Sequence, residues 1–220
     1  MALPTYLSIV NDVLVRLREP TVSSVSENTL SALVGKFVND TKRQVADAYD
    51  WDAFNSSITI TTTSGQWSGY QLVGSGVRFK TMDVINISKQ YPLEPITHQQ
   101  LDLYYYSSAN PQQSTPFNYT YGPVDTNGDM KVNFWPVPDG SYNIRFSLVI
   151  PEIDFSADTD TTTLAKEPII LGAYARALIE RGEDGGMNSS EAYAFYKTSL
   201  ADLISLELAR SPESDAFEAV

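Results

Sequence analysis

The stretch PIILGAYARALIERGEDGGMNSSEAYAFYKTSLADLISLELAR, from Pro168 to Arg210, decides the predicted fold. Its apolar residues recur at helical spacing, which predicts two amphipathic helices. The residues of the two stripes are Ile169, Ile170, Ala173, Tyr174, Ala177 and Leu178, then Ala192, Phe195, Tyr196, Ser199, Leu200, Leu203 and Ile204. The glycine-rich run Arg181–Gly186 is expected to end the first helix, and Ser189 and Ser190 to cap the second.

This hairpin needs a further apolar surface, which two N-terminal helices are expected to supply. One is predicted from about Tyr6 to Leu17, with a cap near Thr5, and a longer one from about Asn28 to Tyr49. Lys36, Asp40 and Lys42 are expected on the outer side of the longer helix. Leu200→Asp is expected to prevent stable folding, because it would bury an unpaired charge in the hairpin.

The apolar period changes from 3.6 to 2 between the two helical segments, which predicts strands. The predicted strands are Ser57–Ser64, Trp67–Val73, one or two within Val77–Lys89, Phe117–Tyr121, Met130–Trp135 and Tyr142–Ile150. We expect a hairpin between the first two and another across Asp125–Gly128. Thr97–Gln100 has the spacing of a capping box, which predicts a short helix ending near Tyr106.

This order of elements predicts an α+β fold: a helical bundle formed by the N- and C-terminal helices, with an inserted β-rich, antiparallel domain. The expected boundaries are 1–54 and 165–210 for the bundle, 55–152 for the insertion, 153–164 for an acidic loop and 211–220 for a C-terminal tail.

Composition argues against several classes of function. The 220 residues include no cysteine and one histidine, His98, so thiolate chemistry is excluded and no Ser/His/Asp set or zinc site can be argued. The net charge of −12 disfavours a protein that wraps nucleic acid. No apolar run reaches the roughly 18 residues of a membrane helix. We therefore expect no enzyme, no cofactor and no membrane contact.

Two acidic segments are candidate cation sites. Asp125–Asp129 alternates oxygen ligands, but its glycine falls at the fourth position, which favours a hairpin turn over a calcium loop. Asp154, Asp158 and Asp160 could hold a divalent ion, although polar loops often have this composition. The expectation is that neither binds a metal.

Large rings are frequent in the β insertion. The candidate interface residues are Trp67, Tyr70, Tyr104, Tyr105, Tyr106 and Trp135. The three consecutive tyrosines cannot all face inward on one helix, so at least one ring should be exposed. The rings could form the sheet core, a subunit or tail interface, or a sugar-binding platform.

Several segments, in their order, resemble a known family. They are Asp50–Asp52 (DWD), Thr59–Leu72 (TITTTSGQWSGYQL), Phe134–Leu164, which contains a P-x-P-D-G turn and an aspartate-rich loop, and Ala177–Glu183. Together they resemble the head-to-tail adaptor proteins of tailed bacteriophages, and most nearly the tail tubular protein A and connector family of short-tailed phages.

The resemblance implies a non-enzymatic structural protein of the virion, made in the host cytoplasm. Such adaptors form a homo-oligomeric ring, often a dodecamer, that binds the portal protein and a tail nozzle or tube. DNA passes through the ring during ejection without specific binding. The alternative is a carbohydrate- or receptor-binding virion module that uses Trp67, Tyr70 and Trp135.

The resemblance also implies a portal contact for the C-terminal segment. The corresponding residues here are Arg210, Ser211, Pro212, Glu213, Phe217 and Val220.

Overall fold

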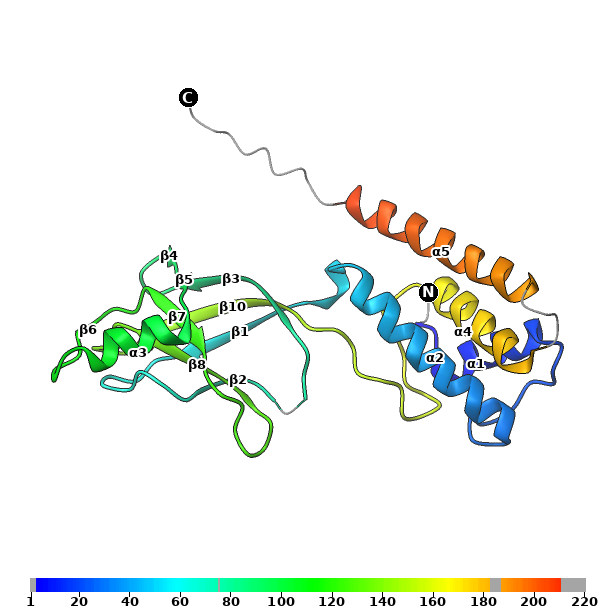
Figure 1. Ribbon diagram of the computed structural model, residues 1–220, viewed down its shortest axis with the longest axis horizontal. Helices are drawn as coiled ribbons and strands as arrows, with labels where there is room; N and C mark the ends of the chain where they lie inside the picture. The colour runs from blue at the N-terminus through cyan, green and yellow to red at the C-terminus, as the bar shows by residue number, and fades with distance from the viewer. Residues whose placement is uncertain (1–2, 75, 183–186, 211–220) are drawn as a thin grey trace, which may run out of the picture. The chain divides into compact units, whose positions relative to one another are not determined.

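The computed structural model describes residues 3–74, 76–182 and 187–210 (Figure 1). The chain divides into two compact units, 1–53 with 152–220 and 54–151. Four long helices lie in the first unit, which we call the helical unit, and the strands and one helix lie in the second, the β unit. Helices built from both chain ends, with mostly antiparallel sheets between them, confirm the predicted α+β class.

Two capped helices begin the helical unit. α1 (Tyr6–Arg16) has Thr5 as its N-cap, whose side chain accepts a hydrogen bond from the Ser8 N–H at 3.2 Å. α2 (Thr29–Ala48) has Asn28, which accepts from the Ser31 N–H at 2.8 Å. Such caps satisfy backbone donors that the first helical turn leaves unpaired. Both predicted N-terminal helices, and the cap near Thr5, are confirmed.

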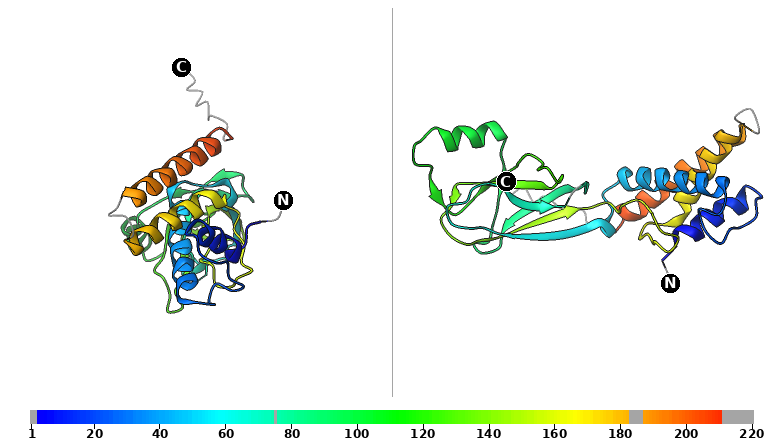
Figure 2. Two further views of the ribbon diagram at one scale, coloured as in Figure 1. Left: turned by 90° about the vertical axis from the view of Figure 1, so that its right-hand side faces the viewer. Right: turned by 90° about the horizontal axis from the view of Figure 1, so that it is seen from below.

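The predicted C-terminal hairpin consists of α4 (Lys166–Arg181) and α5 (Met187–Leu208), which lie side by side and antiparallel (Figure 2). α4 packs against α1, α2 and α5, and Ile169 and Ala173 are fully buried. Gly182 ends α4 with φ at +62°, a left-handed conformation that glycine adopts readily. Residues 183–186 of the predicted turn lie outside the described residues.

α5 differs from its prediction in two ways. The helix already begins at Met187, so Ser189 and Ser190 lie inside it. Phe195, expected on the buried stripe, is 59% exposed, while its neighbour Tyr196 is buried. Adjacent helical residues point about 100° apart, and α5 packs mainly against α4. One neighbouring helix therefore covers only the middle of the stripe.

The β unit contains two four-stranded sheets that share one apolar core. The first has the order β1 (Asn55–Thr61), β10 (Asn143–Val149), β3 (Lys80–Asn86) and β4 (Tyr91–Pro92). The second has the order β2 (Tyr70–Val73), β8 (Met130–Trp135), β7 (Asn118–Tyr121) and β5 (Glu94–Pro95). Side chains from both sheets, such as Phe146 and Phe134, form the core.

The remaining short elements are the 3-10 helix Asp52–Phe54, α3 (His98–Tyr106) and the parallel pair β6 (Gln113–Ser114) and β9 (Val137–Pro138). The capping box of Thr97 and Gln100 confirms the predicted short helix. The predicted hairpin of β7 and β8 is also confirmed, with Tyr119 opposite Phe134.

The predicted hairpin between Ser57–Ser64 and Trp67–Val73 is wrong. β1 pairs with β10, from Asn55 opposite Val149 to Thr61 opposite Asn143, and β2 pairs with β8 in the other sheet. Gly65 adopts φ +78° in the intervening turn, which takes the chain from one sheet to the other. Local alternation identified both strands, but pairing partners that lie 57 to 94 residues apart leave no local signal.

Candidate interaction surfaces

The aromatic residues of α3 form a partly exposed cluster with Trp67 and with Trp135 at the end of β8. The ring centroid of Tyr105 lies 4.3 Å from that of Trp67, and that of Tyr104 lies 5.6 Å from that of Trp135. Tyr106 is 72% exposed, so the expectation that at least one of the three tyrosines is exposed is confirmed. A large accessible ring of this kind suits a protein interface, where aromatics bury much area at low entropy cost.

Two of the expected interface rings lie in the interior. Tyr70 and Trp135 are each 7% exposed. The Tyr70 hydroxyl donates to the Gln66 carbonyl at 2.8 Å, and burial raises the pKa of that hydroxyl. Of the three rings considered for a sugar platform, only Trp67 is partly exposed. The β unit therefore does not present the three-ring surface that the alternative function requires.

A cleft of about 390 Å³ lies between α3 and the β8 region, and we call it the α3 cleft. Its lining includes Trp67, Tyr106, His98, Asp102, Lys131 and Asn133. The exposed rings give it apolar walls, and the amide and charged groups give it polar ones.

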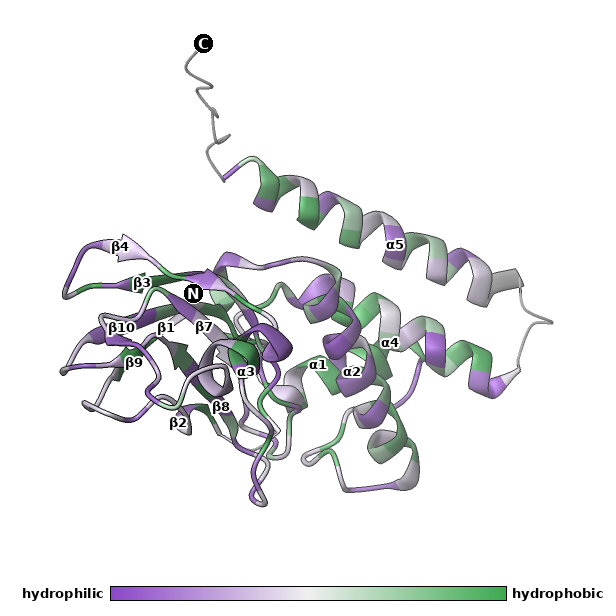
Figure 3. Ribbon diagram, turned by 60° about the vertical axis from the view of Figure 1, so that its left-hand side comes forward, coloured by the Kyte–Doolittle hydropathy of each residue, from purple (hydrophilic) through white to green (hydrophobic). Residues whose placement is uncertain are grey.

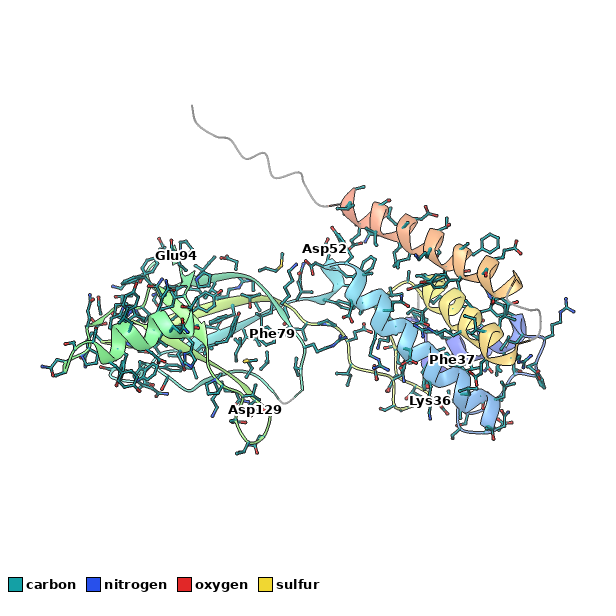
Figure 4. The ribbon with its side chains drawn as sticks, viewed as in Figure 1. Lys36, Phe37, Asp52, Phe79, Glu94 and Asp129 are labelled. Atoms are coloured by element: carbon teal, nitrogen blue, oxygen red, sulfur yellow. The ribbon has the colours of Figure 1, made fainter. Side chains whose placement is uncertain are left out.

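The Asp125 segment is a tight hairpin turn. The Asp125 Oδ1 accepts hydrogen bonds from the N–H groups of Asn127 at 2.9 Å and Asp129 at 3.1 Å. The Asp129 N–H and nearby Lys131 hold the pKa of the Asp125 carboxyl below its usual range. Figure 4 labels Asp129 on this loop. Internal bonds occupy the carboxylate that a calcium loop would direct at the ion.

The aspartates of the acidic loop fasten it to itself and to the N-terminal segment. Asp158 Oδ1 accepts from the Val25 N–H at 3.1 Å, and Asp160 Oδ2 accepts from the N–H groups of Ser156 and Ala157 at 2.7 and 2.8 Å. Within the described ranges, no group of three or more His, Cys, Asp or Glu side chains is arranged to hold a metal ion.

Lys42 contradicts its prediction. It is 2% exposed, whereas Lys36 on the same helix is exposed as expected (Figure 4). Its Nζ donates to the Ile153 carbonyl at 2.7 Å, lies 3.1 Å from Glu152 Oε2 and 3.9 Å from the centroid of the Phe155 ring. The acidic loop covers this face of α2, which the helical period alone could not reveal. The cavity beside it, about 570 Å³, is lined by loop residues that already bond to each other.

Apolar side chains remain exposed along α5. Figure 3 shows hydrophobic residues recurring along the ribbon of this helix. Phe195 and Leu206 lie on one side of the buried stripe, and Tyr193 and Leu208 on the other. We call these four residues the α5 apolar flanks. The apolar arc of α5 is thus wider than the surface that α4 covers. Tyr193, Leu206 and Leu208, which the predicted stripe left out, already indicate this width in the sequence.

The C-terminal segment is described only at its start. Arg210 Nη1 bonds to Glu207 Oε2 at 3.1 Å, and the Asp52 N–H donates to Glu207 Oε1 at 3.1 Å. The bond from Asp52 fastens the end of α5 to the turn that follows α2. The other expected portal contacts, Ser211, Pro212, Glu213, Phe217 and Val220, lie outside the described residues.

Most of the chain matches a known protein family. Residues 4–216 match the family described as SU10 adaptor protein, which spans both units. No curated protein matches the chain. In the part of the chain that the structure describes, no helix has the length and apolar character needed to cross a membrane.

Proposed function

The chain belongs to the SU10 adaptor protein family and is a structural adaptor of the phage virion, and from this we propose that it forms a ring between the portal and the tail. The observation that carries the proposal is the family match across residues 4–216, which includes every described helix and strand. The resemblance to tail tubular protein A extends the proposal to a ring of about twelve copies. In such a ring, cyclic symmetry repeats one contact between neighbours around the axis.

Exposed apolar residues in both units support a role in assembly. A ring subunit needs two different complementary surfaces, since each copy meets one neighbour on either side. The α5 apolar flanks in the helical unit and Tyr106 in the β unit are accessible for such contacts. Trp67, Tyr104 and Tyr105 complete the aromatic cluster that we assign to the subunit or tail interface.

The charge of the chain supports passage of DNA over binding of DNA. A net charge of −12 disfavours contact with phosphates, which Lys and Arg would have to neutralise. Acidic groups lining a channel would repel DNA and keep it from adhering while it leaves the head. The proposed role is therefore a passive conduit without enzymatic chemistry.

Portal binding is assigned to Arg210 and the segment after it. The test mixes the purified chain with purified portal protein and measures mass and shape by native mass spectrometry and electron microscopy. We expect a closed ring of copies on the portal, and the variant ending at residue 210 to lose portal affinity. A chain that retains its helical circular dichroism but never joins a portal, at any ratio, would exclude the proposed function.

A further inference from the structure

β1 is an unusual edge strand. It spans Asn55–Thr61, seven residues, at the edge of the first sheet, and its sequence NSSITIT contains neither a charge nor a proline. Proteins usually protect sheet edges with charges, prolines, bulges or very short strands, because unpaired backbone groups attract other strands. None of these protections is present in β1.

The other terminal strands of the sheets are protected. β4 and β5 have two residues each and contain Pro92 and Pro95, and β6 and β9 also have two residues each. β2 has four residues, and its pairing is broken by a register shift between Gln71 and Val73. The length and composition of β1 therefore set it apart from the other edges of the described sheets.

The backbone groups of β1 that face outward can be identified from the bonds at its two ends. Ile150 N–H donates to Phe54 O at 3.0 Å, and Thr62 N–H donates to Tyr142 O at 2.9 Å. In an antiparallel pair these bonds fall on every second residue. The even-numbered residues of β1 therefore bond to β10, and the backbone groups of Ser57, Thr59 and Thr61 point away from the sheet.

The opposite side of the same sheet has a second incomplete edge. β4 pairs with β3 only at Ile85 and Asn86, and the Leu93 N–H extends this contact to Val84 O at 2.8 Å. Within the described residues, no strand lies beside Thr81–Asp83 on that side. The first sheet thus ends in two different open segments: a regular one on β1, and a short one on β3 where the register against β10 shifts between Asp83 and Thr81.

We propose that Ser57–Thr61 of one copy pairs with Thr81–Asp83 of the next, so that the first sheet continues from subunit to subunit. This inference rests on the proposed ring. Two different edges of one sheet make a head-to-tail contact, which repeats around a closed ring, whereas β1 pairing with β1 would make a two-fold dimer. Both β1 and β3 run antiparallel to β10, so the junction is a parallel pair held by main-chain hydrogen bonds.

The absence of cysteine makes a direct test possible. Ser57 and Asp83 both lie opposite Ser147, so their side chains share one face of the sheet with Thr59. The double variant Thr59→Cys, Asp83→Cys, assembled on the portal and mildly oxidised, should give a ladder of disulfide-linked multimers in denaturing gels. Ser57→Cys and Thr61→Cys, each combined with Asp83→Cys, test the neighbouring registers.

The single-cysteine variants are the controls, and each should remain monomeric in denaturing gels. Dimers from Thr59→Cys alone would overturn the inference in favour of β1 pairing with β1. A disulfide to a cysteine placed on the portal or a tail protein would overturn it in favour of another occupant. Closed rings on the portal with no cross-link in any register would overturn the shared sheet and leave the proposed function standing. A ladder of cross-linked multimers without closed rings would support the shared sheet and overturn the proposed ring.

A backbone substitution gives an independent measurement. Thr59→Pro removes an N–H that points away from β10, so it breaks no bond within the sheet. Edge strands tolerate proline at such positions. We expect each junction to weaken about tenfold, which corresponds to roughly one lost hydrogen bond. Thr59→Ala retains the N–H and is the matched control. Equal ring assembly by the two variants, with equal melting temperatures, would contradict the inference.

Discussion

The two helices of the C-terminal hairpin have similar sequence patterns but different surroundings. α4 packs against three helices, and Ile169, Ile170 and Ala173 are each at most 1% exposed. α5 packs mainly against α4, and Leu200 and Leu203 remain half-buried. Helical spacing shows which residues share a face, but the number of neighbouring elements decides how completely that face is buried. The same substitution should therefore have different effects in the two helices.

The largest expected effect comes from an aspartate placed in each helix. Ile170→Asp should prevent folding, because burying an unpaired charge costs more than the roughly 5–15 kcal/mol that stabilises a domain. Leu200→Asp should still fold with a lower melting temperature, since its carboxylate can reach water from a half-buried position. This replaces the expectation from sequence that Leu200→Asp would not fold. Circular dichroism melts of both variants make the comparison, and equal loss of structure would contradict it.

A covered polar face gives the second largest effect. Lys42→Met should lower the free energy of unfolding by about 3 kcal/mol, because it leaves the Glu152 carboxylate without its ion-pair partner. Adding Glu152→Gln should recover part of this loss, and Lys36→Met, at an exposed position of α2, is the matched control. Urea denaturation of the natural chain, the Lys42→Met and Glu152→Gln single variants and the double variant gives the coupling energy. A coupling near zero would mean that the ion pair does not hold the loop on α2.

The same carboxyl group should make stability depend on acid pH. Burial acts to raise the pKa of Glu152, but hydrogen bonds from Thr163 and Thr162, together with Lys42, outweigh it and hold the pKa below the ordinary value of 4.5. A lowered folded-state pKa stabilises the native chain above that value and loses the effect as the pH falls through the folded-state pKa. Melting temperature should therefore fall below about pH 4.5 less steeply in Glu152→Gln than in the natural chain.

The sequence predicted elements well where the determinants are local. The caps at Thr5 and Thr97 and the turn at Asp125 depend on residues within a few positions, and all form. It failed where a distant segment decides the outcome: β1 pairs with β10 across the whole insertion, and the acidic loop buries Lys42. The exposed tyrosine of α3 could be predicted, because three consecutive residues of a helix cannot share one face. The sheet core was one expected place for the large rings, but which of them are buried, Tyr70 and Trp135 among them, depends on which strands meet in the second sheet.

A smaller effect is expected where α4 approaches its neighbours most closely. A Cβ added at Gly172 would lie 2.4 Å from Thr41 Cγ2 and 3.0 Å from Tyr196 Cδ2, so α2 and α5 would both have to shift. Gly172→Ala should therefore cost about 2 kcal/mol despite its better helix propensity. Gly74→Ala, where a Cβ would meet open space, is the control. A Gly172→Ala variant at least as stable as the natural chain would show that the contact between α4 and α5 is loose.

The smallest effect on folding should come from the α5 apolar flanks. Phe195→Ser should change the free energy of unfolding by less than about 0.5 kcal/mol, because the ring is 59% exposed and its neighbour Tyr196 provides the buried contact. Tyr196→Ser, one position along, should cost about 3–5 kcal/mol, since it empties a fully buried site. If the exposed flank is an assembly surface, Phe195→Ser should assemble less readily on the portal while its melting temperature stays unchanged. Unchanged stability with unchanged assembly would leave Phe195 as an ordinary surface ring, and a large loss of stability would mean that α5 is covered more completely than its contacts with α4 indicate.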